Sequence, residues 1–153
     1  MDILSRLDEA AACVRQGLGD VWDAAVVLGS GLGGFASQVE DARELDYSEI
    51  PHFPVSTVEG HAGKLIGGRV AGKRLLVMAG RFHYYEGYSM EQVTFGIRVL
   101  HRLGVKVLLL SNAGGGVNPA FRPGDVMLIT DHINLMPNPL VGPNIDELGP
   151  RFP

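Results

Sequence analysis

Apolar residues near the amino terminus recur at intervals of three and four positions. The residues with this spacing are Leu4, Leu7, Ala11, Val14 and Leu18. The spacing places them on one face of an α-helix, and the glycines that follow favour its end near residues 17–19. The pattern therefore predicts an amphipathic helix that buries one stripe against the rest of the domain.

Short apolar runs predict strands further along the chain. Residues 24–29, 105–110 and 125–130 are mainly apolar, which is typical of strands buried on both faces of a sheet. Residues 63–70 and 73–79 show alternation and are separated by Ala-Gly, which favours a tight turn. We expect these last two segments to form a β-hairpin.

Two further helices are predicted between the strands. Residues 32–40 follow a glycine-rich turn and have the length of a short helix. Residues 89–103 begin with a capping box, in which Ser89 is the N-cap and Gln92 lies three positions on. Apolar positions then recur on one face of this second helix, which leads directly into the strand predicted at 105–110.

A helix that leads into a continuous apolar strand is the repeating unit of a parallel sheet covered on both faces. We therefore predict an α/β fold with a mixed, mostly parallel twisted sheet flanked by helices. At 153 residues the chain has the length of one domain with a real core. We expect residues 1–153 to form a single domain.

Composition and charge narrow the classes of function. The formal net charge is −4 and the sequence has no basic run or stripe, so we expect no nucleic-acid or membrane partner. The acidic start does not fit a signal peptide, and no apolar run approaches the length of a membrane span. The one cysteine, Cys13, excludes an internal disulfide, so we expect a cytoplasmic protein.

Two glycine-rich turns, each directly after a predicted buried strand, are the main chemical feature of the sequence. They occupy residues 29–34 and 111–116. Glycine lets the main chain approach a ligand closely, so that consecutive N–H groups can converge on an oxyanion. Ser30, Arg81 and Asn112 all fall just after predicted strands, where ligands of such sheets bind. The pattern indicates a phosphate-binding crevice.

Arg81 and His83 lie between the two turns. They share one side of an extended segment, so both side chains can reach one phosphate. Arginine offers a planar fork of donors, and histidine offers a donor and a proton carrier. Glu86 can orient that imidazole or bind the substrate. The alternative is a surface arginine with a histidine satisfied by its neighbours.

Other site classes have weaker support in the sequence. Gly29, Gly31 and Gly34 match the dinucleotide fingerprint, but residues 47–51 make a poor second strand for the acidic residue that it needs. A dinucleotide-binding module therefore stays open as an alternative. The five histidines have no metal-ligand spacing, so we expect no metal. No P-loop or nucleophile-elbow motif is present in the sequence.

Five motifs together resemble the purine nucleoside phosphorylases of the trimeric class. They are residues 27–33 (VLGSGLG), 59–63 (EGHAG), 80–88 (GRFHYYEGY), 112–115 (NAGG) and 131–135 (DHINL). They occur in the family's order across nearly the whole chain. The resemblance implies phosphorolysis of purine ribo- or deoxyribonucleosides to free base and (deoxy)ribose 1-phosphate in purine salvage.

The resemblance also implies roles for individual residues. The phosphate would be held by Ser30, His61, Arg81, His83 and the backbone N–H of Ala113. The ribose and base would contact Tyr85, Asn112, Ala113, Gly114 and Phe152 of a neighbouring subunit. Catalysis is assigned to His83, Glu86 and Asn112. The partners implied are a purine nucleoside, inorganic phosphate as co-substrate and two further copies in a homotrimer, with no cofactor.

One departure from the family limits this expectation. Family members continue well beyond Pro153, with the residues that bind the purine, a second phosphate-contacting serine and more of the ribose pocket. We therefore expect the amino-terminal portion of a longer phosphorylase domain, which carries the phosphate half-site and is catalytically incomplete alone. The remaining alternatives are a methylthioadenosine-type phosphorylase of the same fold and a non-catalytic fragment.

Overall fold

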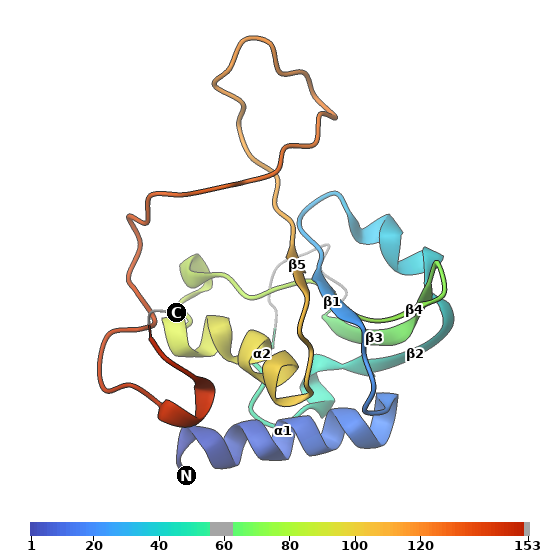
Figure 1. Ribbon diagram of the computed structural model, residues 1–153, viewed down its shortest axis with the longest axis vertical. Helices are drawn as coiled ribbons and strands as arrows, with labels where there is room; N and C mark the ends of the chain where they lie inside the picture. Colours follow the sequence, from blue (N-terminus) through green and yellow to red (C-terminus); the bar gives the residue numbers. More distant parts are fainter. Residues whose placement is uncertain (56–62, 152–153) are drawn as a thin grey trace.

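The computed structural model describes residues 1–55 and 63–151 (Figure 1). The strands of this part of the chain are β1 (Ala24–Val27), β2 (Glu40–Asp46), β3 (Lys64–Val70), β4 (Lys73–Ala79) and β5 (Leu108–Leu110). The α-helices are α1 (Ile3–Leu18) and α2 (Met90–Arg102). The short 3-10 helices are η1 (Gly33–Gln38), η2 (Tyr47–Glu49), η3 (Tyr84–Glu86) and η4 (Asp146–Leu148).

The strands form one five-stranded mixed sheet within the described residues, in the order β2-β3-β4-β1-β5. β1 pairs in parallel with both β4 and β5, while β3 pairs antiparallel with β2 and β4. The predicted hairpin is confirmed as β3 and β4. Its connection uses Ala71 at φ 49° and Gly72 at φ 75°. Two positive φ values suit the right-handed twist of the flanking strands.

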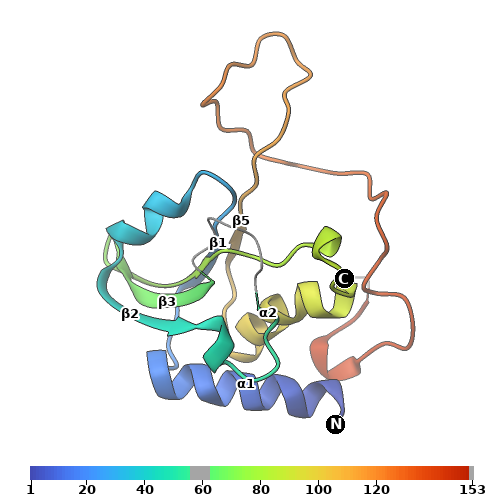
Figure 2. The same cartoon turned by 180° about the vertical axis from the view of Figure 1, so that it is seen from behind.

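The two α-helices cover one face of the sheet (Figures 1 and 2). The main core joins α1 and α2 to side chains of β1, β3 and β4, including Leu76 and Met78. The alternate β4 residues, Val77 and Ala79, pack on the opposite face with Phe35 of η1. This alternation is the period-2 pattern expected of a strand with both faces covered.

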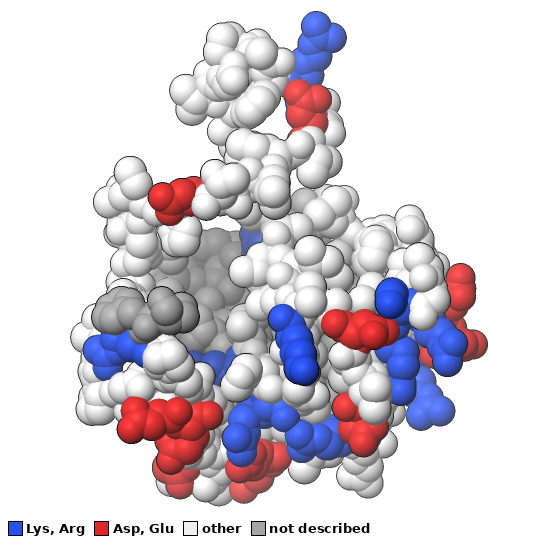
Figure 3. All heavy atoms as spheres, in the orientation of Figure 1, with Lys and Arg blue, Asp and Glu red and all other residues white. Residues whose placement is uncertain are grey.

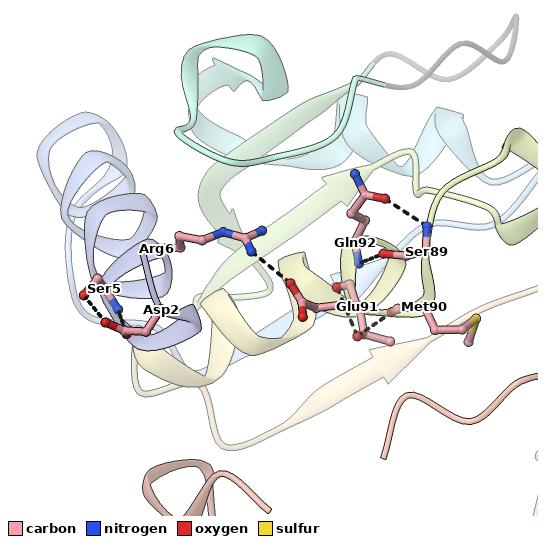
Figure 4. Close-up of polar contacts among 8 residues, drawn as sticks. Asp2, Ser5, Arg6, Ser89, Met90, Glu91 and Gln92 are labelled. Carbon is pink, nitrogen blue, oxygen red and sulfur yellow. Dashed lines mark hydrogen bonds and ion pairs between the residues drawn. The ribbon is translucent and has the colours of Figure 1, made fainter. Parts of the chain in front are cut away.

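Figure 4 shows the N-cap of α2 and the contact of Arg6 in α1 with Glu91 in α2. The capping box is confirmed, because Gln92 N donates to Ser89 Oγ at 3.2 Å and Ser89 N donates to Gln92 Oε1 at 2.9 Å. The Arg6 side chain of α1 reaches Glu91 of α2 at 2.9 Å. At the other end of α2, Arg102 pairs with Asp8 of α1. The two pairs connect α1 to both ends of α2 at the protein surface.

The structure corrects three of the predicted elements. The helix predicted at 32–40 is the shorter η1, and β2 begins at Glu40. The strand predicted at 105–110 is limited to Leu108–Leu110. Residues 125–130, predicted as a strand, have no regular structure. A strand needs a neighbour for its N–H and C=O groups, and none of the described strands pairs with this segment.

Residues 111–145 instead form an extended arm that leaves the body after β5 and returns beside α2 (Figures 1 and 2). Many of its apolar side chains face solvent, and Val126 is 99% exposed. The projecting part of the arm carries few charged side chains, while the body below it shows both signs interspersed (Figure 3). The arm is therefore an exposed apolar surface of the kind that usually marks an interaction region.

Among the described helices, none combines the length and the apolar character that crossing a bilayer requires.

Candidate active site

Three loops meet where β1, β4 and β5 end. Because these strands run in parallel, their carboxyl ends lie at the same edge of the sheet. The Gly29 N–H donates to Ser111 Oγ at 2.8 Å, across 82 positions of sequence. Arg81 follows β4, and its Nη1 donates to the Ser111 carbonyl at 2.7 Å. The two glycine turns and Arg81 are therefore adjacent, as their positions after strands predicted.

The approach of the first glycine turn to the second leaves no room for a side chain at Gly29. A Cβ there would lie 2.6 Å from the Ser111 carbonyl oxygen and 2.9 Å from Asn112 Cα. Both of these atoms belong to the backbone, so neither can move without displacing a strand end. Glycine at this position is thus required by close packing rather than by an unusual φ.

Arg81, His83 and Glu86 form one hydrogen-bonded chain. Arg81 Nε donates to His83 Nε2 at 3.2 Å, and His83 Nδ1 lies 2.7 Å from Glu86 Oε1. A guanidinium group has no acceptor, so Nε2 must accept and the ring proton belongs on Nδ1, where it is donated to Glu86. Glu86 therefore orients the imidazole, which is one of the two roles predicted for it.

The η3 turn holds this chain in place. Glu86 Oε1 also accepts the backbone N–H of His83 at 2.9 Å, and Gly87 ends the turn at φ 91°. The Glu86 side chain is 3% exposed and the His83 side chain 13% exposed. A carboxylate with so little access to water fixes the position of its partners more firmly than a surface carboxylate would.

Tyr85 packs on His83 on the solvent side. Their rings stack with centroids 4.7 Å apart and an angle of 20° between the planes. Tyr85 is 74% exposed. An exposed aromatic ring beside a candidate phosphate site is suitably placed for a sugar, and the ribose contact of Tyr85 stays a prediction.

Tyr47 supports the turn that carries Arg81. Its hydroxyl donates to the carbonyl of Gly80 at 2.8 Å, and its side chain is almost fully buried among aromatic rings that include Phe82. Burial raises the pKa of the Tyr47 phenol above its usual range. No periodic pattern predicts this role, because Tyr47 lies in η2 and not in a strand or α-helix.

The remaining predicted residues lie around this centre. Asn112, Ala113 and Gly114 open the arm beside Gly29 and are exposed, and Asn112 Nδ2 donates to the Ala113 carbonyl at 3.1 Å. Ser30 is also exposed. His61 and Phe152, predicted to bind phosphate and ribose, fall outside the residues that the structure describes. The structure thus brings Arg81, His83 and Glu86 into direct contact and leaves the other assignments as predictions.

A cavity of about 220 Å³ adjoins the first glycine turn. Ser30, Gly31 and Gly80 contribute to its lining, together with the ion pair between Lys64 and Glu44 at 2.6 Å. Arg81 and His83, both in the described part of the chain, do not line this cavity. The hydrogen bonds that connect the first glycine turn to Arg81 therefore pass through Ser111, for which the sequence predicted no role.

One sequence signal points to Ser111, a hydroxyl residue that ends an apolar strand, but this signal alone is too common to be decisive. No group of three or more His, Cys, Asp or Glu side chains within the described ranges has the arrangement of a metal site.

Comparisons with known proteins identify the family of this chain. Residues 23–153 match the family model described as "Phosphorylase superfamily". Purine nucleoside phosphorylase 1 of Bacillus subtilis is 54% identical over 149 residues, which are 97% of this chain and 55% of that protein. Mouse purine nucleoside phosphorylase is 55% identical over 133 residues, which cover 84% of this chain and 46% of the mouse protein.

Solved structures show the same relationship. The purine nucleoside phosphorylase of Schistosoma mansoni in complex with acetate superposes with a TM-score of 0.89 at 42% identity. The match covers 98% of this chain and 57% of that one. This chain thus spans about half the length of the relatives that it matches. The resemblance to purine nucleoside phosphorylases is confirmed, and by the match over residues 23–153 the chain belongs to the phosphorylase superfamily.

Proposed function

We propose that this chain carries the phosphate half-site of a purine nucleoside phosphorylase. The reaction is the phosphorolysis of purine ribo- or deoxyribonucleosides to free base and (deoxy)ribose 1-phosphate in purine salvage. The observation that supports it most strongly is the Arg81 guanidinium, held by the Ser111 carbonyl and His83 beside the Gly29 turn. Arginine and a glycine-rich turn at one sheet edge are well suited to a phosphate dianion.

The proposed chemistry divides between positioning and charge. The C1′–N9 bond breaks with its electron pair leaving on the purine, while a phosphate oxygen forms the new bond to C1′. Positive charge develops on the sugar, and a phosphate fixed beneath it stabilises that charge before capturing it. Arg81 would hold the phosphate. His83, oriented by Glu86, would add a contact once Nε2 carries a proton and donates it to phosphate in place of accepting from Arg81.

We place the other assignments within the same proposal. Ser30, His61 and the Ala113 N–H would contact phosphate, while Tyr85, Asn112 and Gly114 would line the ribose and base pocket. Phe152 would reach the ribose of a neighbouring subunit in a homotrimer. Since the chain spans about half of its relatives' length, we propose that it is the amino-terminal part of a cytoplasmic phosphorylase domain and is inactive alone.

Phosphate binding measured by titration calorimetry tests the half-site. Arg81→Ala removes a hydrogen-bonded cation, a loss of about 1.5–3 kcal/mol or roughly 10- to 150-fold in affinity. Arg122→Ala removes the same charge from the exposed arm and should bind phosphate as the unsubstituted chain does. Equal affinity in all three proteins would overturn the assignment.

An NAD titration and an activity assay separate the alternatives. NAD binding without phosphate binding would favour a dinucleotide module over a phosphorylase. Incubation of the chain with phosphate and inosine should release no hypoxanthine, because the residues proposed to hydrogen-bond the purine belong to the part of the fold that this chain does not span. Measurable release would refute the incompleteness while supporting the reaction.

A further inference from the structure

We infer that Ser111 is a positioning residue that couples the first glycine turn to Arg81, and so prepares the phosphate site without touching phosphate. This inference deepens the proposed function and rests on it for the identity of the ligand. The hydroxyl and the backbone carbonyl of Ser111 have different partners, and each partner belongs to a different predicted part of the site.

All the polar groups of Ser111 have hydrogen-bond partners. Its backbone N–H donates to the Val27 carbonyl at 3.2 Å, and its hydroxyl donates to the same carbonyl at 2.8 Å. The hydroxyl oxygen accepts the Gly29 N–H at 2.8 Å. The carbonyl oxygen accepts Arg81 Nη1 at 2.7 Å. Ser111 therefore contacts the end of β1, the glycine turn and the guanidinium at once.

The register of the sheet explains why the hydroxyl matters. Along the parallel pair of β1 and β5, Ala25 N donates to Val107 O and Ser111 N donates to Val27 O. Continued by one more step, this ladder would direct the Gly29 N–H to the Ser111 carbonyl. The Ser111 hydroxyl accepts that N–H instead. The carbonyl is therefore available to hold Arg81.

Loss of the hydroxyl should disturb Arg81 through this exchange. With alanine at position 111, the Gly29 N–H has lost its acceptor in a partly buried setting, where an unsatisfied donor is costly. The nearest replacement acceptor is the backbone carbonyl of residue 111, because the two backbones are already close at Gly29. That carbonyl would then be shared with Arg81, and the guanidinium would lose its fixed orientation. Threonine at position 111 keeps the hydroxyl and should keep the arrangement.

The test compares Ser111→Ala, Ser111→Thr and the control Ser37→Ala in the 153-residue chain. Ser37 also donates its hydroxyl to a backbone carbonyl, that of Gly34 at 2.8 Å, but it has no bond to the site. We expect Ser111→Ala to weaken phosphate binding about tenfold, the effect of one hydrogen bond to a charged group. Ser111→Thr and Ser37→Ala should stay within about twofold of the unsubstituted chain, by the same scale.

A double-variant cycle separates positioning from general damage. If Ser111 acts through Arg81, then Ser111→Ala should add less than about twofold to the loss in an Arg81→Ala background. Equal losses in the two backgrounds would show that Ser111 acts independently of Arg81, and would overturn the inference. So would unchanged phosphate affinity in Ser111→Ala.

A second readout does not depend on phosphate. The Nε–Hε NMR signal of Arg81, assigned by its disappearance in Arg81→Lys, should shift in Ser111→Ala and stay in place in Ser111→Thr and Ser37→Ala. An unmoved signal in Ser111→Ala would overturn the inference.

If the unsubstituted chain fails to bind phosphate, the proposed function fails and this signal alone decides the role of Ser111. If Ser111→Ala does not fold, Ser111→Cys, whose sulfur is a weak acceptor, replaces it in both measurements.

Discussion

Replacing Gly29 with alanine places a methyl group in space that the second glycine turn already fills. The added carbon would lie 2.6 Å from the Ser111 carbonyl oxygen, 3.0 Å from the Ser111 carbonyl carbon and 2.9 Å from Asn112 Cα. Ordinary contacts between such atoms are about 3.5–4 Å, so the two strand ends must separate by roughly an ångström. No flexible side chain is available to absorb the shift.

The expected cost has two parts. Overpacking of this kind destabilises by about 1–3 kcal/mol. Separation of the strand ends also lengthens the bonds from Gly29 N to Ser111 Oγ and from Arg81 to the Ser111 carbonyl. Each of these contributes about 0.5–3 kcal/mol. We expect a total loss of about 2–4 kcal/mol, most of it from the steric clash and the Gly29 bond.

Urea unfolding followed by circular dichroism measures this loss, with Gly33→Ala and Gly34→Ala as matched controls. Both control glycines have open space around an added Cβ, and neither has a positive φ. Alanine there should be neutral or stabilise by up to about 1 kcal/mol, since it restricts the unfolded chain. A Gly29→Ala protein as stable as the two controls would refute the close approach of the two glycine turns.

Four further outcomes follow from the structure. Tyr47→Phe should lower the free energy of unfolding by about 1–3 kcal/mol, because the Gly80 carbonyl loses its buried donor. Burial raises the pKa of Tyr47 in the folded state, so its contribution is present below the unfolded pKa of about 10 and lost as pH rises above it. Urea titrations at pH values from about 8 to about 11 span the unfolded pKa. Over this range the free energy of unfolding should fall more steeply in the unsubstituted chain than in Tyr47→Phe. Ser89→Ala removes the N-cap of α2 and should cost about 1 kcal/mol, measured in the same urea assay; a change below about 0.3 kcal/mol would contradict the capping role. The exposed apolar arm should cause association at high protein concentration, and Val126→Glu combined with Leu128→Glu should reduce it in sedimentation velocity. Equal association of the unsubstituted chain and the double variant would show that the arm is not the surface through which the chains associate.

Local patterns in the sequence were sufficient for several elements. The three-and-four spacing from Leu4 to Leu18 predicted α1, and the Ser89–Gln92 capping box marked the start of α2. The two-residue link at 71–72 predicted the β3–β4 hairpin. Each of these signals depends on residues within about one or two turns of one another, so it can be recognised without knowledge of the fold.

Elements that depend on distant partners were predicted less well. β2 was missed, because Glu40–Asp46 is mostly charged and exposed and is a strand only through its pairing with β3. Residues 125–130 were wrongly predicted as a strand because they have suitable apolar character, but no partner strand lies beside them in the described structure. Strand formation requires a neighbour as well as a propensity.

The candidate site shows the same division. The sequence by itself determined which residue types are present, because glycine turns, an arginine and a histidine after strands are recognisable as parts of an anion site. Only the tertiary structure decided how they connect: Ser111 joins Gly29 across 82 positions and Arg81 across 30. Those bonds exist because β1, β4 and β5 are neighbours that end at one edge of the sheet. Strand order is set by packing of the whole chain, so no local pattern can specify it.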